Sequence, residues 1–186
     1  MSDEIVEQNP DYFSDGDLAD AENLPEGPRY IGYVSKVDVS QAEPGKFRRM
    51  DPDTIRKSSK LRKALAGRDE VPQVDIDITA LGRAGEGRFD PEANYYRTSS
   101  QSFWVGREDR IGRHSLARLV RDAAGIDEED LKKKITILEA AIKLEKVYVT
   151  FEVKHRKFET RSGGEGIAQD FKKIKPATMN EIEAVQ

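Results

Sequence analysis

Alternation of apolar and polar residues predicts five β-strands between residues 28 and 177. The pattern is strictest in residues 72–82, where Val74, Ile76 and Ile78 share one face and polar residues occupy the other. The other four expected strands occupy residues 28–40, 100–106, 146–159 and 167–177. Successive side chains of a strand point to opposite faces, so each strand is expected to bury one face.

Two helices are expected between the third and fourth strands. Residues 114–125 carry an apolar stripe at helical spacing and end at Gly125, a residue type that favours the end of a helix. Asp127 is a good N-cap for a second helix, whose apolar stripe runs from Leu131 to Ile142. A short helix near residues 54–66 completes the expected elements.

The order of these elements predicts a mainly β fold with helices, of the α+β class. Five short strands with helices between the third and fourth are the layout of the OB fold, a five-stranded Greek-key barrel. An open five-stranded α+β sheet gives the same pattern, so the sequence leaves both architectures open. We expect this domain to span residues 29–177, followed by a short C-terminal tail, residues 178–186.

Charge divides the chain into an acidic start and a basic remainder. The whole chain has 35 acids and 31 Lys and Arg residues, a net charge of −4. Residues 1–28 hold nine of the acids and no Lys or Arg, and few aliphatic residues, which predicts an acidic disordered N-terminal tail. Such a tail either improves solubility, recruits partner proteins or masks the basic domain.

Composition excludes several classes of chemistry. The chain has no cysteine, so disulfides, thiolate catalysis and cysteine-ligated zinc are excluded. The two histidines stand forty-one residues apart, which argues against a histidine metal site, and we expect neither a cofactor nor an enzymatic activity. No apolar run approaches the roughly 18–20 residues of a membrane span, and the first residues are acidic, unlike a signal peptide. We therefore expect a cytoplasmic protein without a membrane segment.

Basic residues cluster where an OB fold would place the walls of its binding groove. In OB folds the ligand crosses the second and third strands, between the loop that joins the first two strands and the loop that joins the last two. Residues 46–68 of the first loop hold nine bases and two acids, and the second loop begins in another basic run. A third cluster follows the third strand. Cations that neutralise phosphates release counterions, so these clusters predict contacts to a nucleic-acid backbone. The predicted contacts are Arg48, Arg49, Lys57, Lys60, Arg107, Arg110, Arg113, Lys154, Arg156 and Lys157.

Two aromatic residues are candidates for base stacking. Trp104, the only tryptophan, lies on the polar face of the third strand with Ser100 and Ser102. Tyr148 points outward from the fourth strand in the same way. An exposed aromatic ring can stack with any base, at about 1–3 kcal/mol per base. The alternative interpretation is that Trp104 packs beneath a loop or helix and has a structural role.

A nuclease is the enzymatic alternative. Glu152 and Lys154, with Asp75 and Asp77 upstream, look like the Asp…Glu-x-Lys signature of restriction-endonuclease-like nucleases, in which carboxylates hold Mg²⁺. The gap of 75 residues between Asp77 and Glu152 is longer than that family usually shows. Glu-x-Lys is also common on solvent-facing strands, so this interpretation ranks below nucleic-acid binding.

The overall plan resembles a phage-encoded family of OB-fold single-stranded DNA-binding proteins. The resemblance covers most of residues 28–177: the opening PRYIGYVSKVDV, SQSFWVG followed by SLARLVRDAAGI, and the ending EKVYVTFEVKHRKFE…IAQDFKKIKPA. It implies sequence-independent binding of single-stranded DNA during replication or recombination. Replication or recombination proteins recruited by residues 1–28 are the implied partners, although such acidic tails are usually C-terminal. A virion or assembly protein that uses a barrel for interaction is a further alternative.

Overall fold

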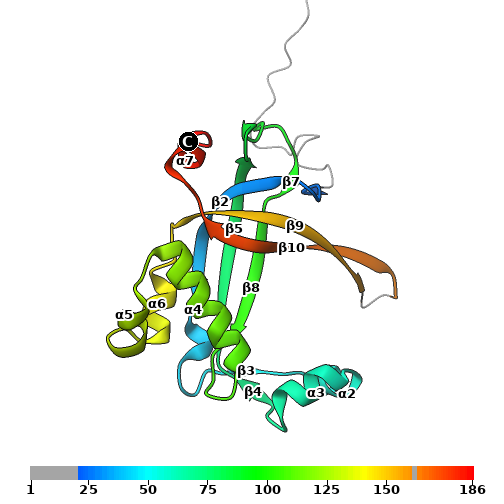
Figure 1. Cartoon of the computed structure of the whole chain (residues 1–186). Helices are drawn as coiled ribbons and strands as arrows, with labels where there is room; N and C mark the ends of the chain where they lie inside the picture. Colours follow the sequence, from blue (N-terminus) through cyan, green and yellow to red (C-terminus); the bar gives the residue numbers. More distant parts are fainter. Residues whose placement is uncertain (1–20, 161–162) are drawn as a thin grey trace, which may run out of the picture.

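The computed structural model describes residues 21–160 and 163–186 and has the expected α+β composition (Figure 1). Its long strands are β2 (Arg29–Asp38), β5 (Gln73–Arg83), β8 (Thr98–Trp104), β9 (Tyr148–Glu159) and β10 (Glu165–Pro176). Its two-residue strands are β1 (Glu22–Asn23), β3 (Arg48–Arg49), β4 (Glu70–Val71), β6 (Gly87–Arg88) and β7 (Tyr95–Tyr96). The helices are η1 (Ser40–Ala42), α2 (Pro52–Lys57), α3 (Ser59–Leu65), α4 (Arg110–Ala124), α5 (Glu128–Lys133), α6 (Ile137–Ile142) and α7 (Met179–Glu183). Within the described ranges, no helix has both the length and the apolarity that a bilayer crossing requires.

One antiparallel sheet carries the five long strands in the order β10-β9-β2-β5-β8. Each of them lies where the alternating pattern predicted a strand. β2 is central: Tyr30 stands opposite Phe151 of β9 on one side and Arg83 of β5 on the other. The short strand β6 pairs with the end of β5.

The sheet is not closed into a barrel, so the closed OB barrel that the sequence predicted is not confirmed. The edge strands β8 and β10 lie next to each other, but no backbone ladder joins them in the described part of the chain. Side chains bridge them instead: Ser99 Oγ donates to the carbonyl of Gln169 at 3.1 Å, and Gln101 Nε2 donates to that of Phe171 at 2.5 Å. Helix α4 packs against both strands and covers this boundary. We call the boundary between β8 and β10 the seam.

The inward face of the sheet and helix α4 share one hydrophobic core. Val74, Ile76 and Ile78 of β5 are fully buried, as their alternation with acids predicted. Phe151 of β9 stacks on Phe171 of β10 with ring centroids 4.0 Å apart. Full burial of a large apolar side chain contributes roughly 1.5–3 kcal/mol, so these residues fix which face of each strand points inward.

The region between β8 and β9 contains one more helix than the sequence predicted. Helix α4 begins at Arg110, earlier than expected, and ends before Gly125, whose φ of 65° is left-handed. The expected second helix is wrong in its length, because the chain forms α5 and α6 instead. Thr136 and Glu139 form a capping box that starts α6, with Glu139 accepting the Thr136 N–H at 2.8 Å. The apolar stripe continues through this break, which is why the pattern did not reveal it.

The N-terminal boundary of the domain lies earlier than the sequence predicted. Residues 21–28 were expected to belong to the tail, but β1 pairs with β7 and Leu24 is fully buried. Tyr30 Oη donates to the carbonyl of Pro25 at 2.8 Å, and Glu26 accepts the backbone N–H of His155. The tail boundary at residue 28 is therefore wrong, and the expectation for residues 1–20 lies outside the described residues.

The C-terminal residues 178–186 also belong to the folded body, so the prediction of a short tail there is wrong. A capping box between Thr178 and Glu181 starts α7, and Val185 is only 2% exposed. Glu181 forms an ion pair with Arg29 at the start of β2. These contacts tie the C-terminus to the central strand of the sheet.

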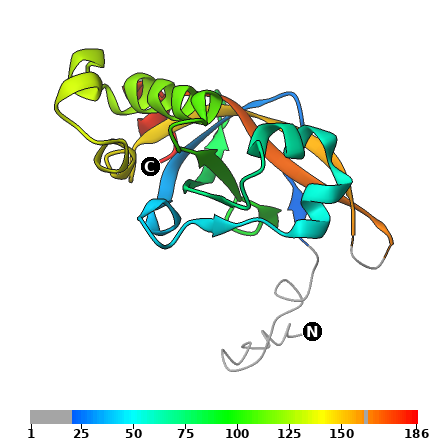
Figure 2. The ribbon, with the colours of Figure 1, turned by 90° about the horizontal axis from the view of Figure 1, so that it is seen from below.

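Two projections, one basic and one of mixed charge, leave the body on the same side. The first, which we call the basic arm (residues 46–70), consists of the β3–β4 pair with α2 and α3 between its strands. The second is the outer end of the β9–β10 pair, which we call the hairpin (residues 154–160 and 163–170) and which holds three Lys and Arg residues and three acids. Figures 1 and 2, which are views at right angles, both place the arm and the hairpin at the same side of the sheet.

Candidate nucleic-acid interface

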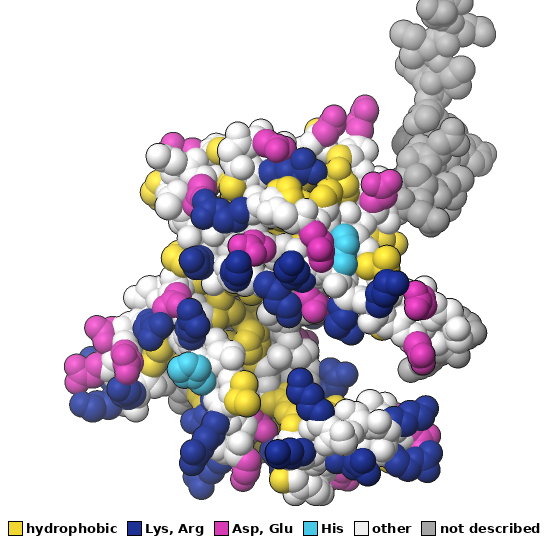
Figure 3. Space-filling view, turned by 45° about the vertical axis from the view of Figure 1, so that its right-hand side comes forward, with side chains coloured by type: hydrophobic (Ala, Val, Ile, Leu, Met, Phe, Trp, Pro, Cys, Tyr) yellow, Lys and Arg dark blue, Asp and Glu magenta, His cyan; other side chains and the backbone are white. Residues whose placement is uncertain are grey.

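A groove lies at the seam, and residues of β8, β10 and helix α4 line it. It has a volume of about 800 Å³, and Phe103 of β8, Leu119 of α4 and Ile174 of β10 contribute apolar side chains to it. Its polar side chains include the basic residues His114, Arg118, Lys173 and Lys175 and the acidic residue Asp122. Figure 3 shows the molecule hollowed at its centre, with apolar side chains inside the hollow and Lys and Arg side chains along its border. We call this feature the seam groove.

An irregularity in β10 turns lysine side chains toward the groove. The pairing of β10 with β9 shifts between Lys172 and Lys175, and Lys173 adopts a left-handed φ of 53°. A β-bulge of this kind breaks the alternation of side chains, so the consecutive residues Lys173, Ile174 and Lys175 all line the groove. A non-glycine residue in the left-handed region costs roughly 1–3 kcal/mol, and such positions are concentrated at functional sites.

The cations of the groove differ in how far they are neutralised. Lys173 Nζ lies 3.0 Å from Glu152 Oε1, and Arg118 Nε lies 3.5 Å from Asp122 Oδ2. The hydrogen bond from Arg121, more than the charge of Arg118, holds the pKa of Asp122 below its usual value, so this carboxyl stays ionised beside the groove. Lys175 forms no ion pair with another described residue.

Replacing Lys173 by glycine should separate its charge from its backbone role. Glycine adopts φ 53° without steric cost, so Lys173→Gly should leave the free energy of unfolding unchanged or raise it by up to about 1 kcal/mol. The loss of one cation should reduce the slope of log K for nucleic-acid binding against log salt concentration by about 0.7 in magnitude. Urea unfolding and titrations at several salt concentrations measure the two effects.

Lys175→Gly is the matched control for that variant, because it removes the same charge from the neighbouring stretch of β10. Glycine at an ordinary strand position is expected to lower stability by roughly 0.5–1 kcal/mol. Equal losses of stability in the two variants would contradict the strain assigned to Lys173.

The predicted arm and hairpin residues are exposed, as phosphate contacts require. In the arm, Arg49 pairs with Glu70 at 3.2 Å. In the hairpin, Arg156 pairs with Asp170 at 3.5 Å and Lys157 with Glu165 at 3.4 Å. Exposed ion pairs of this kind contribute only about 0–1 kcal/mol, so phosphate groups can displace them. The other predicted members, Arg48, Lys57, Lys60 and Lys154, have no ion-pair partner within the described ranges.

The third predicted cluster is divided among different surfaces. Arg107 is exposed in the turn between β8 and α4. Arg110 lines a hollow beside Trp104, whereas Arg113 lies on the side of α4 that faces α5 and α6, among Leu131 and Ile135. The prediction that Arg113 shares one surface with Arg107 and Arg110 is therefore wrong, because the helical period turns Arg113 away from the groove.

Trp104 is half-buried in a hollow of about 510 Å³ on the opposite face of β8 from Phe103. The first turn of α4 crosses the tryptophan so closely that a Cβ atom on Gly112 would lie 2.1 Å from the Trp104 carbonyl oxygen. Ala64 of α3 and Ile111 of α4, which is 86% exposed, also line the hollow. The acidic residues Glu108 and Asp109 and the basic residue Arg110 complete the lining of this hollow, which is large enough for a base.

Tyr148 lies in a different hollow, of about 470 Å³, together with Arg88 and Lys146. Its ring packs against Tyr33, with centroids 6.1 Å apart. The structure therefore does not bring Tyr148 and Trp104 into one pocket, as a single stacking platform would require.

Carboxylates occupy the outward face of β5, where the OB-fold analogy placed the ligand. Asp75 and Asp77 accept hydrogen bonds from Ser102 and Ser100 of β8, each at 2.5 Å. Two acids at the centre of this face repel phosphates, so the seam groove is the better path for a polyanion. The nuclease alternative needs these acids beside Glu152, but no three acidic or histidine side chains of the described residues are close enough to share a metal ion.

The seam groove was not predicted from the sequence. Its lysines belong to the run Lys172-Lys173-Ile174-Lys175-Pro176, which the alternation assigned only to the last strand. The signal for a functional surface was the density of lysine in a strand that should bury one face. No protein-family model matches the chain, and no curated protein matches its sequence significantly.

Proposed function

We propose that this chain binds single-stranded nucleic acid, and single-stranded DNA in particular, along the seam groove and between the basic arm and the hairpin. The observation that carries the proposal is the groove itself: apolar side chains line it and basic side chains border it. The basic arm and the hairpin lie on one side of the molecule. The cations attract the phosphates, whereas the apolar side chains accept unstacked bases.

We also propose that the sheet is an open variant of the OB fold. Among the five long strands, β9-β2-β5-β8 have the spatial order fourth, first, second, third, which is the order of a Greek key. Helices α4, α5 and α6 lie between the third and fourth strands, as in the expected layout. Membership of the phage single-stranded DNA-binding family, with a role in replication or recombination, stays part of this proposal.

The contacts available on these surfaces favour binding that is independent of sequence. Exposed lysine and arginine side chains contact phosphates, which are the same at every nucleotide, and they carry no sequence information. Partner recruitment through the acidic N-terminal segment stays a prediction, since residues 1–20 lie outside the described residues.

A mobility-shift comparison at fixed salt tests the proposal. Oligo-dT, duplex DNA and an RNA of equal length are offered to the full chain side by side, and oligo-dT is expected to bind at least as tightly as the others. Tighter binding of the duplex would contradict the single-strand proposal. Failure to bind any of the three, combined with a stable oligomer in solution, would favour an assembly protein instead.

A further inference from the structure

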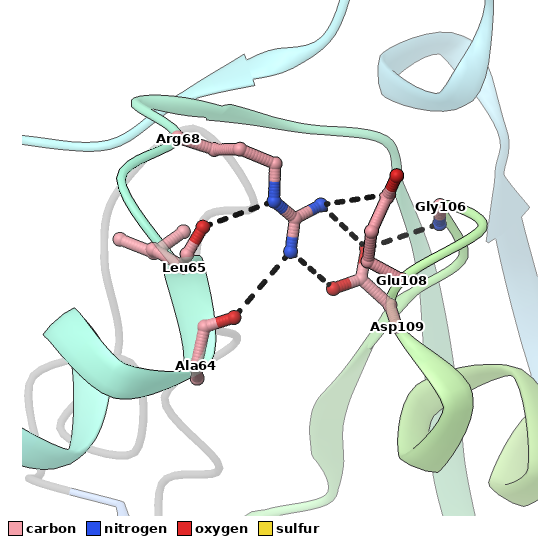
Figure 4. A network of polar contacts seen from close by, with 6 residues as sticks. All are labelled: Ala64, Leu65, Arg68, Gly106, Glu108 and Asp109. Atoms are coloured by element: carbon pink, nitrogen blue, oxygen red, sulfur yellow. Dashed lines mark hydrogen bonds and ion pairs between the residues drawn. The ribbon is translucent and has the colours of Figure 1, made fainter.

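Arg68, at the base of the basic arm, binds the acidic residues at the N-terminus of helix α4 (Figure 4). Its Nη2 and Nη1 atoms donate to the two carboxylate oxygens of Asp109 at 2.7 and 3.1 Å. Glu108 adds a weaker ion pair at 3.6 Å. The Nε atom donates to the carbonyl of Leu65 at 3.0 Å, so the same guanidinium also caps the C-terminal end of α3.

The side chain of Asp109 binds Arg68 and does not cap the helix that it precedes. It occupies the N-cap position of α4, yet its side chain makes no capping hydrogen bond. Its oxygens accept from Arg68 and from the backbone N–H of Gly106 at 3.1 Å, and its side chain is only 5% exposed. A buried carboxylate is costly unless it is paired and hydrogen-bonded. Movement of the arm away from α4 would take Arg68 from Asp109, so the pair favours the docked position of the arm.

Few other polar contacts hold the arm. Among the described residues, the ion pairs of Arg68 with Glu108 and Asp109 are the ones that join residues 46–70 to a segment beyond residue 71. The docked arm also brings Ala64 of α3 to the hollow that Trp104 and the first turn of α4 line. The position of the arm thus determines the shape of the hollow and the placement of the arm cations.

We infer that the Arg68–Asp109 pair is a positioning device for single-strand binding: it locks the basic arm against α4, so that the arm cations and the Trp104 hollow are in place before the ligand arrives. This inference rests on the proposed function. A protein whose binding-competent form is only partly populated loses apparent affinity by that fraction. Arg68 and Asp109 need not contact the nucleic acid to affect its binding.

The test uses Asp109→Asn, with Asp53→Asn as the matched control. Each variant removes one acid, but Asp53 lies in the exposed part of the arm, where it pairs with Arg56. An effect of charge alone would tighten the binding of oligo-dT in both variants. Positioning predicts instead that Asp109→Asn weakens binding about tenfold, as expected if about a tenth of the molecules keep the arm docked. The salt slope should stay unchanged, because the same phosphates are contacted.

Limited proteolysis measures how often the arm leaves its docked position, and it requires no ligand. Trypsin should cut after Lys57 and Lys60 about tenfold faster in Asp109→Asn than in the natural chain or in Asp53→Asn. The double variant Arg68→Ala/Asp109→Ala should give the same acceleration, and it leaves no unpaired buried charge to destabilise the fold.

The possible results separate the two proposals. If the natural chain binds no single strand, the proposed function fails, and equal cleavage rates would still overturn the positioning device. If the natural chain binds and Asp109→Asn binds as tightly as Asp53→Asn, with equal protection from trypsin, the inference is wrong. Weaker binding together with faster cleavage in the arm supports it.

Discussion

Reversing two charges of the seam groove, with Arg118→Glu and Lys175→Glu in one chain, is expected to weaken the binding of oligo-dT by roughly 10- to 100-fold at moderate salt. The two side chains come from opposite borders of the groove, α4 and β10, so a strand that lies in the groove passes both. Each phosphate contact that is lost should also flatten the slope of log K against log salt by about 0.7.

Lys132→Glu with Lys133→Glu is the matched control for this variant. These lysines lie on α5, where their side chains are 67% and 69% exposed and pair with Glu128 and Glu129. The net charge changes by the same amount, so long-range repulsion affects both double variants alike. A similar loss of affinity in the two would mean that overall charge, and not the seam groove, governs binding.

Trp104→Ala is expected to cost about 1–3 kcal/mol of binding free energy, which corresponds to roughly 5- to 150-fold in affinity. The reason is that the exposed part of the ring lines a hollow beside Arg110, where a base can stack while its phosphate meets a cation. Trp104→Phe should recover part of the loss, because phenylalanine keeps an aromatic face. Titrations of the three proteins with oligo-dT, followed by fluorescence anisotropy of a labelled oligonucleotide, measure these differences.

The stability of Trp104→Ala decides between the two roles of the tryptophan. Because the ring is only half-buried, its loss should destabilise the fold by less than the 3–5 kcal/mol that a fully buried tryptophan costs. A loss of that full size, with unchanged affinity for oligo-dT, would assign Trp104 a structural role under α4.

Local patterns predicted the strands well because each has its own alternation. β5 is the clearest case, since every second residue from Val74 to Ala80 is buried. The closure of the sheet was less predictable, because it depends on how β8 and β10 meet across a long stretch of sequence. There Ser99 and Gln101 use side chains in place of a backbone ladder, and no local pattern distinguishes these two arrangements.

The candidate site was predictable where charge alone defines it. The arm and the hairpin were found as basic segments, and the structure places both at one side of the sheet. The seam groove depends on the register shift between Lys172 and Lys175, and the position of the basic arm depends on the Arg68–Asp109 pair. Neither feature has a local signal, because a left-handed lysine and a distant ion pair arise only from the tertiary fold.

Titration of labelled oligo-dT with the full chain gives the most direct test of single-strand binding. The anisotropy of the oligonucleotide is followed at several salt concentrations, together with the fluorescence of Trp104, which lies on the opposite face of β8 from the seam groove. Single-strand binding predicts saturable binding and quenching that salt reverses, with a slope of about −0.7 for each phosphate neutralised. Arg118→Glu/Lys175→Glu should bind more weakly and with a flatter slope. Absence of quenching together with absence of any salt-sensitive binding would contradict single-strand binding by this chain.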